Sequence, residues 1–563
     1  MKKPVKVLGL ALGAVVAFLA AAVLVFTLSF DPNRYKDDIE RMARERTGRT
    51  LRLQGELKLA FFPSLGASVG RVTLSERGSN REFVTLQSAH ASVKLMPLLH
   101  RQVIIDAVRV SGLKAQIVRN RDGSYNFSDL LEGKAEKPAP KPAPETKDQS
   151  ASVVFDIAGV DIDRAAVAYR DTNTGQEISL SDLTLHTGRI AENAQGRVEF
   201  AATAKRSQPP LEVKIALHGS YSLQPDSIGL EFTARLDQSN IKGKLGMART
   251  AQPSYRFELD IDRLDLDPYL ASSQTKLQGA KQDQPAQDPA VDLSGLKGLN
   301  AQGQLHVGAL QVQGLKLSTL KAQLKAAGGR AEISPHSASL YEGELSGALS
   351  LDGNANRIAL KETFSNVSVG PLLRDLARQD RLEGKGNVAL ELTAAGATVS
   401  TMKRSLAGAA KVRLRDGAIK GIDIAELLRK ARAAVGKQSA QAADGKESTG
   451  FSELAASFAI KNGVAHNEDL DIKSPLLRLG GSGDIDIGRS TISYLVKASV
   501  VATAKGQGGK GLDQLAGLTV PVKLGGPLDA MTYQVDYRAA AGDLAKSKVG
   551  DKVKERLKGL LRR

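Results

Sequence analysis

The feature that most constrains the fold is an alternation of apolar and polar residues that recurs along most of the chain. It is clear in "LEVKIALHGSYSL" (211–223) and in "QLHVGALQVQGLKLSTLKAQL" (304–324). A period of two places every second side chain on the same side of a β-strand. The runs are short and are separated by Gly, Asn and Asp, which are typical of tight turns. The pattern therefore predicts a mainly β protein with a long, twisted antiparallel sheet and a few short helices.

The same alternation leaves two architectures open. If the apolar faces meet, the molecule is a filled sandwich, and if they stay apart, it is a groove. Aromatic residues make up only 4% of the chain, Trp is absent and Gly occurs 54 times. Large aromatic side chains dominate compact cores, so this composition favours many thin layers over a few thick ones.

The first thirty residues indicate a membrane anchor. After three lysines, residues 7–30 run for 24 positions without a charge, which as a helix would span about 36 Å. A cleaved signal peptide is the alternative, but its apolar region is usually about 7–15 residues and ends in small residues. The lysines favour a cytoplasmic N-terminus. We therefore expect a single-pass protein with its bulk outside the cytoplasm, and no nucleic-acid partner despite the net charge of +17.

The segment after the anchor changes from a helical to a strand pattern. Asp31 and Pro32 favour a helix start, and Gly48 favours its end. From Leu51 the period becomes two, which predicts one strand that continues until Pro63 and Gly66 break it.

Changes in composition divide the chain. A stretch rich in Pro and Lys predicts an extended linker, and a stretch rich in Gln and Ala predicts a disordered one. The predicted segments are an anchor at 1–30, an N-terminal region at 31–132, the first linker at 133–150, a middle β-rich region at 151–270, the second linker at 271–290, a C-terminal β region at 291–545 and a basic tail at 546–563.

The C-terminal region contains further local signals. Val399, Met402 and Leu406 have helical spacing, Asp416-Gly417 predicts a turn, and Asp423 is a candidate N-cap. The tail has two interpretations: an amphipathic helix on an anionic membrane or a partner, or a solvated helix that closes one end of the sheet.

No motif supports catalysis or cofactor binding, and we expect no enzyme activity, catalytic residue, cofactor or metal. Gly66-Ala-Ser68-Val-Gly70 matches a nucleophile elbow only as a string, because its surroundings predict a strand. The glycine-rich stretch 506–511 is followed by too few residues for the helix of a dinucleotide site. Cys is absent, and the seven His are scattered. The carboxylates of 259–267 favour a solvated strand over a calcium site.

Three stretches carry a family resemblance. "FDPNRYKDDIERMARERTGRTLRLQGELKLAFFPSLG" (30–66) resembles the entry segment of the AsmA family of bacterial envelope proteins, with its Asp-Pro, Tyr35, Thr-Gly turn and Leu-x-Gly-x-Leu strand. Residues 382–430 and the run "GGSGDIDIGRSTISYLVKASVV" resemble the C-terminal region of the family.

The resemblance implies a fold, a location and a function. Proteins of this family are anchored in the inner membrane of Gram-negative bacteria, extend into the periplasm, and are related to TamB and to bridge-like lipid transfer proteins. Their sheet is expected to form an elongated open groove with an apolar interior. The implied role is outer-membrane assembly, with phospholipid carried along that groove between the membranes. The alternative is an assembly factor that carries no lipid but influences the targeting or insertion of outer-membrane proteins. The expected partners are membrane phospholipids, the inner membrane, and outer-membrane or envelope proteins at the C-terminal end.

Overall fold

A computed structural model describes residues 31–61, 64–99, 104–131, 156–270, 288–378, 380–421, 423–424, 448–475, 477–501, 519–528 and 530–535. The predicted anchor (1–30), the first linker (133–150), most of the second linker (271–290), the glycine-rich stretch 506–511 and the basic tail (546–563) lie outside these residues. None of the helices in the described part of the chain is long and apolar enough to cross a membrane.

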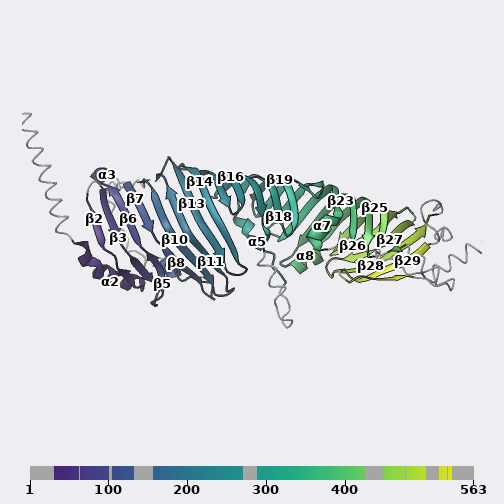
Figure 1. The fold of residues 1–563 in the computed structure, drawn as a ribbon, viewed down its shortest axis with the longest axis horizontal. Helices are drawn as coiled ribbons and strands as arrows, with labels where there is room; N and C mark the ends of the chain where they lie inside the picture. Colours follow the sequence, from purple (N-terminus) through teal and green to yellow (C-terminus); the bar gives the residue numbers. More distant parts are fainter. Residues whose placement is uncertain are drawn as a thin grey trace, which may run out of the picture. The chain divides into compact units, whose positions relative to one another are not determined.

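The described chain is mainly β with a few short helices, as the alternation predicted (Figure 1). It divides into two compact units. Unit 1 runs to Leu259 and includes Ala271–Thr275, and unit 2 contains Asp260–Leu270 and the chain from Lys276 onward. The division point lies inside strand β17 (Ser254–Asp265). The predicted domain boundaries stay predictions.

Unit 1 begins with the predicted helical segment. A 3-10 helix, η1 (Pro32–Tyr35), leads into α2 (Lys36–Thr47), which ends at Gly48 in the left-handed conformation with φ +68°. Side chains of these helices bond the backbone of the first strands. Leu57 N–H donates to Asn33 Oδ1 at 2.9 Å, and Leu53 N–H donates to Glu40 at 2.6 Å. The entry segment thus occupies donors that an edge strand would otherwise leave free.

The remaining elements of unit 1 are nearly all strands. They are β1 (Leu51–Leu53), β2 (Leu57–Ala60), β3 (Ser64–Val69), β4 (Val72–Ser75), β5 (Glu82–Leu86), β6 (Ser88–Lys94), α3 (Leu95–Leu99), β7 (Ile104–Ser111), β8 (Lys114–Arg119), α4 (Ser128–Leu131), β9 (Asp156–Ile157), β10 (Val160–Asp171), β11 (Glu177–Thr187), β12 (Ile190–Ala191), β13 (Ala194–Arg206), β14 (Leu211–Leu223), β15 (Ser227–Leu236) and β16 (Ser239–Ala248).

The sheet of unit 1 divides into two branches at β10. The first half of β10 pairs with β7, which continues to β6, β3 and β2. The second half pairs with β8, which continues to β5, β4 and β1. The expectation of a purely antiparallel sheet is wrong here, because β10 runs parallel to both β7 and β8, and β9 runs parallel to β7. Parallel pairing requires a long crossover, and the chain between β8 and β10 contains the predicted first linker.

The single strand predicted from Leu51 is in fact two strands in different branches, since β1 pairs with β4 and β2 pairs with β3. The break is at Gly55, where a Cβ would lie 2.3 Å from the Cα of Gly70, so the two chain segments touch and exclude any side chain. The prediction that Gly66 ends a strand is also wrong. Gly66 lies within β3, where it pairs with Ala60 on one side and Ser92 on the other.

Unit 2 contains longer strands and a few short helices. They are α5 (Asp267–Leu270), η3 (Ser294–Gly298), β18 (Ala301–Val312), β19 (Leu315–Ala327), β20 (Arg330–Leu340), β21 (Gly343–Asp352), β22 (Arg357–Ser368), α7 (Val369–Ala377), β23 (Leu382–Ala395), α8 (Val399–Ser405), β24 (Ala407–Lys420), β25 (Ser448–Lys461), β26 (Val464–Lys473), β27 (Leu477–Asp486), β28 (Thr491–Val500), β29 (Thr519–Pro527) and β30 (Thr532–Val535).

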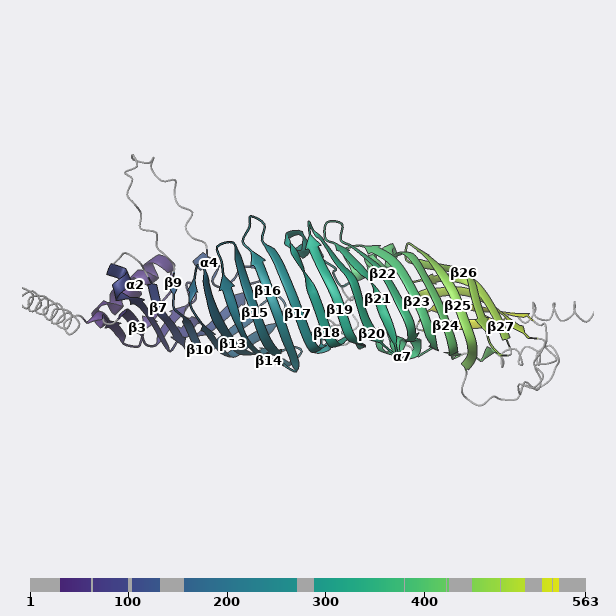
Figure 2. The same ribbon diagram turned by 90° about the horizontal axis from the view of Figure 1, so that it is seen from above.

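The strands of unit 2 follow one another in chain order, as an antiparallel meander from β18 to β30 (Figure 2). Several turns are two-residue hairpins with positive φ at both positions, including Gln313-Gly314, Gly328-Gly329 and Asn462-Gly463. This geometry matches the twist of the flanking strands and suits Gly and Asn. No pairing joins β30 back to β18 among the described strands, so the sheet of unit 2 is open.

Bulges interrupt many of the long strands. The register shifts at Thr319, Asn366 and Asp416 accompany positive φ values of 51°, 54° and 49°. A bulge adds one residue to a strand, bends it and increases its twist. The turn predicted at Asp416-Gly417 is therefore wrong, because β24 continues through it as a bulged strand.

The helix predicted from Val399 is confirmed as α8, with Met402 buried.

Candidate functional site

One face of strands β13–β16 in unit 1 is apolar. Its one charged residue is Arg206, at the end of β13. Directly opposed residues of antiparallel strands share a face, and the pairing therefore sorts the side chains. The row Phe200, Leu217, Ala234 and Ile241 is bordered by similar rows. We call this side the unit 1 apolar face. Its larger side chains are Val198, Phe200, Leu211, Val213, Ile215, Leu217, Tyr221, Leu223, Ile228, Leu230, Phe232, Leu236, Ile241, Leu245 and Met247.

The unit 1 apolar face is only partly buried. Of its larger side chains, Val213 is buried, Leu245 is 41% exposed and the others are half-buried. Aromatic rings lie across neighbouring glycines on the same face. A Cβ on Gly243 would lie 2.4 Å from Cζ of Phe232, and one on Gly196 would lie 2.3 Å from the ring of Tyr221. The face is thus a continuous hydrocarbon surface that the described chain leaves accessible.

The opposite side of the same strands is polar and exposed. Lys205 and Glu212 form a cross-strand ion pair at 3.1 Å, and Lys244 and Glu231 form another at 3.4 Å. The alternation of the sequence thus produces one solvent-exposed polar face and one apolar face on these strands.

Unit 2 has a corresponding apolar face across β18–β23. One of its central rows contains Gly303, Leu324, Ile333, Leu349, Leu360 and Leu392, all of them half-buried. Helical segments cover its two margins. Leu296 and Leu299 of the η3 segment pack on the row of Ala301, Ala326 and Ala331, and α7 contacts β19 and β23 near the other margin. The central rows lie between these margins.

One polar pair lies in the middle of this face. His336 and Glu362 flank Gly347 in the row that also contains Leu305, Ala322 and Leu390, and His336 Nε2 is 2.9 Å from Glu362 Oε2. A Cβ on Gly347 would lie 2.3 Å from that carboxylate oxygen, so glycine leaves the room that the pair needs.

The pair is arranged to carry no net charge. The carbonyl of Ile333, 3.2 Å from His336 Nδ1, can only accept, so Nδ1 carries a hydrogen. The bond between Nε2 and Oε2 then requires one proton, on either atom, and the pair is neutral in both arrangements. The two side chains are 11% and 13% exposed, and burial raises the pKa of Glu362. Neutrality lowers the cost of placing these groups on an apolar face.

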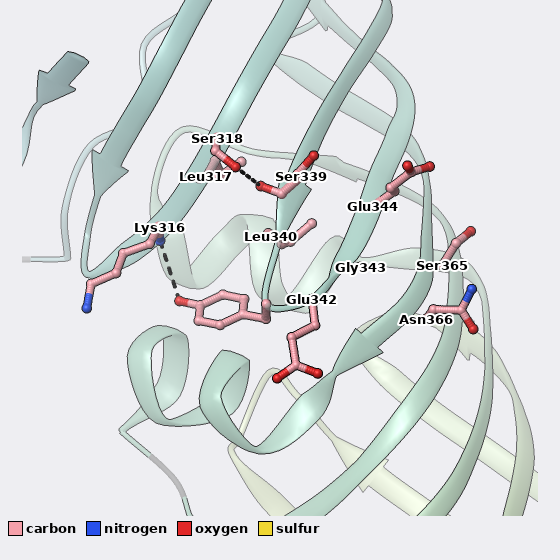
Figure 3. Close-up of a pocket in the computed structure, with 11 residues that line it drawn as sticks. Lys316, Leu317, Ser318, Ser339, Leu340, Glu342, Gly343, Glu344, Ser365 and Asn366 are labelled. Atoms are coloured by element: carbon pink, nitrogen blue, oxygen red, sulfur yellow. Dashed lines mark hydrogen bonds between the residues drawn. The ribbon is translucent and has the colours of Figure 1, made fainter. Parts of the chain in front are cut away.

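A cavity of about 700 Å³ lies at the turn between β20 and β21 (Figure 3). Its lining is largely polar, and the turn itself consists of Tyr341 and Glu342, both with positive φ. Tyr341 donates to Asp375 of α7 at 2.7 Å, and burial raises the pKa of Tyr341 to about 12. Lys385 Nζ forms an ion pair with Glu342 Oε2 at 3.2 Å. These bonds connect the turn to its neighbours.

Two of the sequence motifs, 66–70 and 259–267, lie in the described residues. The string from Gly66 to Gly70 lies mainly in β3, without the strand-to-helix turn of a nucleophile elbow. Ser68 Oγ is 2.8 Å from His90 Nδ1 across β3 and β6, but no carboxylate bond to His90 is found among the described residues.

The carboxylates of 259–267 have separate partners. Asp260 bonds His306 at 3.0 Å, and Asp267 accepts from Gly314 N–H at 3.1 Å. No group of three or more potential metal ligands occurs within the described ranges.

Comparison with known proteins identifies the family. The profile of the AsmA family matches residues 1–266 and 227–470. The chain belongs to the AsmA family. Protein AsmA of Escherichia coli (strain K12) is 21% identical over 597 aligned residues, which cover 96% of this chain and 94% of that protein. No solved structure matches the chain significantly.

Sequence reasoning found the apolar faces of this AsmA-family chain but not the polar pair within one of them. His336 and Glu362 are 26 residues apart, and only the register of β20, β21 and β22 brings them together. A signal was available in the sequence, because Glu362 occupies an apolar phase of its alternating strand, between Leu360 and Phe364.

Proposed function

We propose that this AsmA-family chain binds the acyl chains of phospholipids along its apolar faces, shaped as an elongated groove, and so carries phospholipid between the inner and outer membranes of a bacterial envelope. In this proposal the first thirty residues anchor the chain in the inner membrane and the bulk lies in the periplasm. The same activity would serve the assembly of the outer membrane, the role implied by the family resemblance.

The observation that carries the proposal is the partial burial of a continuous hydrocarbon surface. Monomeric soluble proteins rarely expose large apolar areas, and a large exposed patch normally marks a binding site. The rows of β13–β16 and the central rows of β18–β23 offer aliphatic and aromatic groups and very few hydrogen-bonding ones. The matching occupant is a molecule that needs no hydrogen bonds over its length, as an acyl chain does.

The energetics explain how such a surface would act without catalytic groups. Exposing one methylene to water costs about 0.8 kcal/mol, so a 16-carbon tail costs roughly 12 kcal/mol. A continuous apolar surface removes most of that barrier for a lipid that crosses an aqueous compartment. Aliphatic contacts also discriminate weakly between tails, which suits a bulk carrier.

The test uses Leu245, which is 41% exposed on the unit 1 apolar face, so that its replacement leaves no cavity in a packed core. We expect Leu245→Asp to lose most co-purified phospholipid. A charge in hydrocarbon costs about 2.5–3.5 kcal/mol, or roughly a hundredfold in occupancy. The full chain is purified in mild detergent, and bound lipid is extracted and counted by mass spectrometry.

The matched control is Thr233→Asp, which adds the same charge to the polar face of β15, where Thr233 is exposed and opposite Lys242. Its lipid content should equal that of the wild type. Wild-type protein without stoichiometric phospholipid, or equal lipid in both variants, would exclude transport along the apolar faces. That result would favour an assembly factor that acts on outer-membrane proteins without carrying lipid.

A further inference from the structure

The apolar side of β25–β29 is filled along all five strands, whereas full burial in β18–β23 is limited to some residues, such as Val307 at 1% and Val367 at 0% exposed, and leaves the two central rows half-buried. Leu479 is 1% exposed, Ala498 0% and Val520 1%, and these three residues are directly opposed in neighbouring strands. They belong to one cluster of buried side chains, which we call the C-terminal core. Its members are Val369, Leu414, Ile424, Phe451, Leu454, Ile472, Leu477, Leu479, Tyr494, Val496, Ala498, Val500 and Val520.

The polar groups inside the C-terminal core are satisfied by one another. Asn467 is 1% exposed, its amide donates to Ser457 O at 2.7 Å, and its carbonyl oxygen accepts from the hydroxyl of Tyr494. Burial raises the pKa of Tyr494 to about 12. Buried polar groups in protein interiors are normally hydrogen-bonded, and Asn467 and Tyr494 follow that rule.

The side chains that close this core come from outside the strands as well as from them. Val369 and Leu373 of α7 pack against it, and so does Ile424, whose N–H donates to Thr449 at 3.0 Å. The first strand that contributes a central residue is β24, through Leu414. In the preceding strand, Leu382 packs against the cluster at one end, but Leu390 and Leu392 are half-buried and do not belong to it.

We propose that the lipid-binding face of unit 2 ends at β24, so that acyl chains occupy β18–β23 and are excluded from β25–β29. Protein interiors are packed as densely as organic crystals, and a filled core leaves no volume for a methylene chain. Lipid therefore leaves or enters unit 2 sideways, before the last strands, and not by passing over them. The inference rests on the proposed function, because it states where on unit 2 the bound acyl chains end.

The direct test maps the contacts of the lipid on the unmodified protein. Full-length wild-type chain is loaded with a phospholipid that carries a diazirine in one acyl chain, irradiated, digested and analysed by mass spectrometry. We expect adducts on peptides of β18–β23 and their loss when unlabelled phospholipid competes. Peptides of β25–β29 should carry none.

The outcomes separate the two proposals. Competable adducts on the inward residues of β27 and β28, in yield similar to those on β21 and β22, would overturn the boundary and leave lipid binding intact. Absence of competable adducts anywhere in the chain would overturn lipid binding itself.

A second measurement tests the closure without any lipid. The chain contains no cysteine, so a single introduced thiol is uniquely reactive. Ala322→Cys lies in a half-buried central row and Ala456→Cys lies in the filled region, where Ala456 is 7% exposed. We expect an apolar maleimide to label the first variant in the folded protein and the second only after denaturation. Equal labelling of the two folded variants would contradict the boundary.

Discussion

At the scale of single residues, the most completely buried charge in the described part of the chain belongs to Arg49. Its side chain is 0% exposed, its Nε donates to Asp129 Oδ2 at 3.0 Å, and its guanidinium lies 5.0 Å from the centre of the Phe83 ring. Further bonds reach the carbonyl oxygens of Ser75 and Asn126. The side chain of Arg49, two residues after α2, thus links this part of the chain to β4 and to the region of α4.

Arg49→Met should therefore destabilise the chain by about 3–5 kcal/mol, because it leaves the carboxylate of Asp129 without its partner in a partly buried place. The control is Arg41→Met, which removes the exposed ion pair between Arg41 and Asp38 and should cost no more than about 1 kcal/mol. Chemical denaturation of both variants measures the difference. Equal losses would show that Arg49 acts as any surface arginine does.

The pair of His336 and Glu362 predicts a pH dependence. Burial raises the pKa of Glu362, so the folded state disfavours its charged form. Below the ordinary pKa of a glutamate, about 4.3, this carboxyl makes its full contribution to the free energy of unfolding. That contribution is lost as the pH rises through the higher pKa that Glu362 has in the folded state. Relative to Glu362→Gln, the wild type should lose stability over that interval. Thermal melts of both proteins across the interval measure this, and a difference that does not change with pH would contradict it.

At the scale of elements, the bulges determine how long strands bend. Asn366 adopts a left-handed φ of +54° within β22, and the register shifts between Phe364 and Val367. Only Gly adopts this conformation without cost, and Asn tolerates it better than branched residues do.

Asn366→Val should consequently be less stable than Asn366→Gly by about 1–2 kcal/mol, the cost of a left-handed conformation for a residue with a Cβ. Both variants lose the same contact of the amide with Arg415, so that loss cancels in their difference. Denaturant titration of the two variants provides the value. If the valine variant were as stable as the glycine variant, the bulge would not require this conformation.

The elements show what local sequence determines. Gly48 was predicted to end the first helix, and it does so with φ +68°. Asp416-Gly417 carries the same kind of signal as a hairpin turn, yet it forms a bulge, because β24 remains paired on both sides with β23 and β25. A positive φ is all that the dipeptide encodes, and the pairing around it decides between a turn and a bulge. The parallel pairing of β10 was not predictable either, since it joins segments that a long connection separates.

At the scale of the molecule, the alternation predicted the faces but not what covers them. Leu217 in β14 and Leu479 in β27 occupy equivalent phases of similar strands, and the first is half-buried whereas the second is 1% exposed. Leu479 belongs to a cluster of buried side chains that also includes residues from outside the strands, such as Val369 and Ile424. Periodicity records only which side of a strand is apolar. Whether that side meets other parts of the chain depends on the tertiary structure.

The meander from β18 to β30 has a consequence for how such a chain is made and how it changes. Each of these strands finds its partner in the next segment to leave the ribosome, so the sheet of unit 2 can zip up progressively during synthesis. For the same reason, duplication of one hairpin would add two strands to the sheet, and each new strand would pair with the strand next to it in sequence. A ribbon built in this way can be lengthened in evolution by small steps.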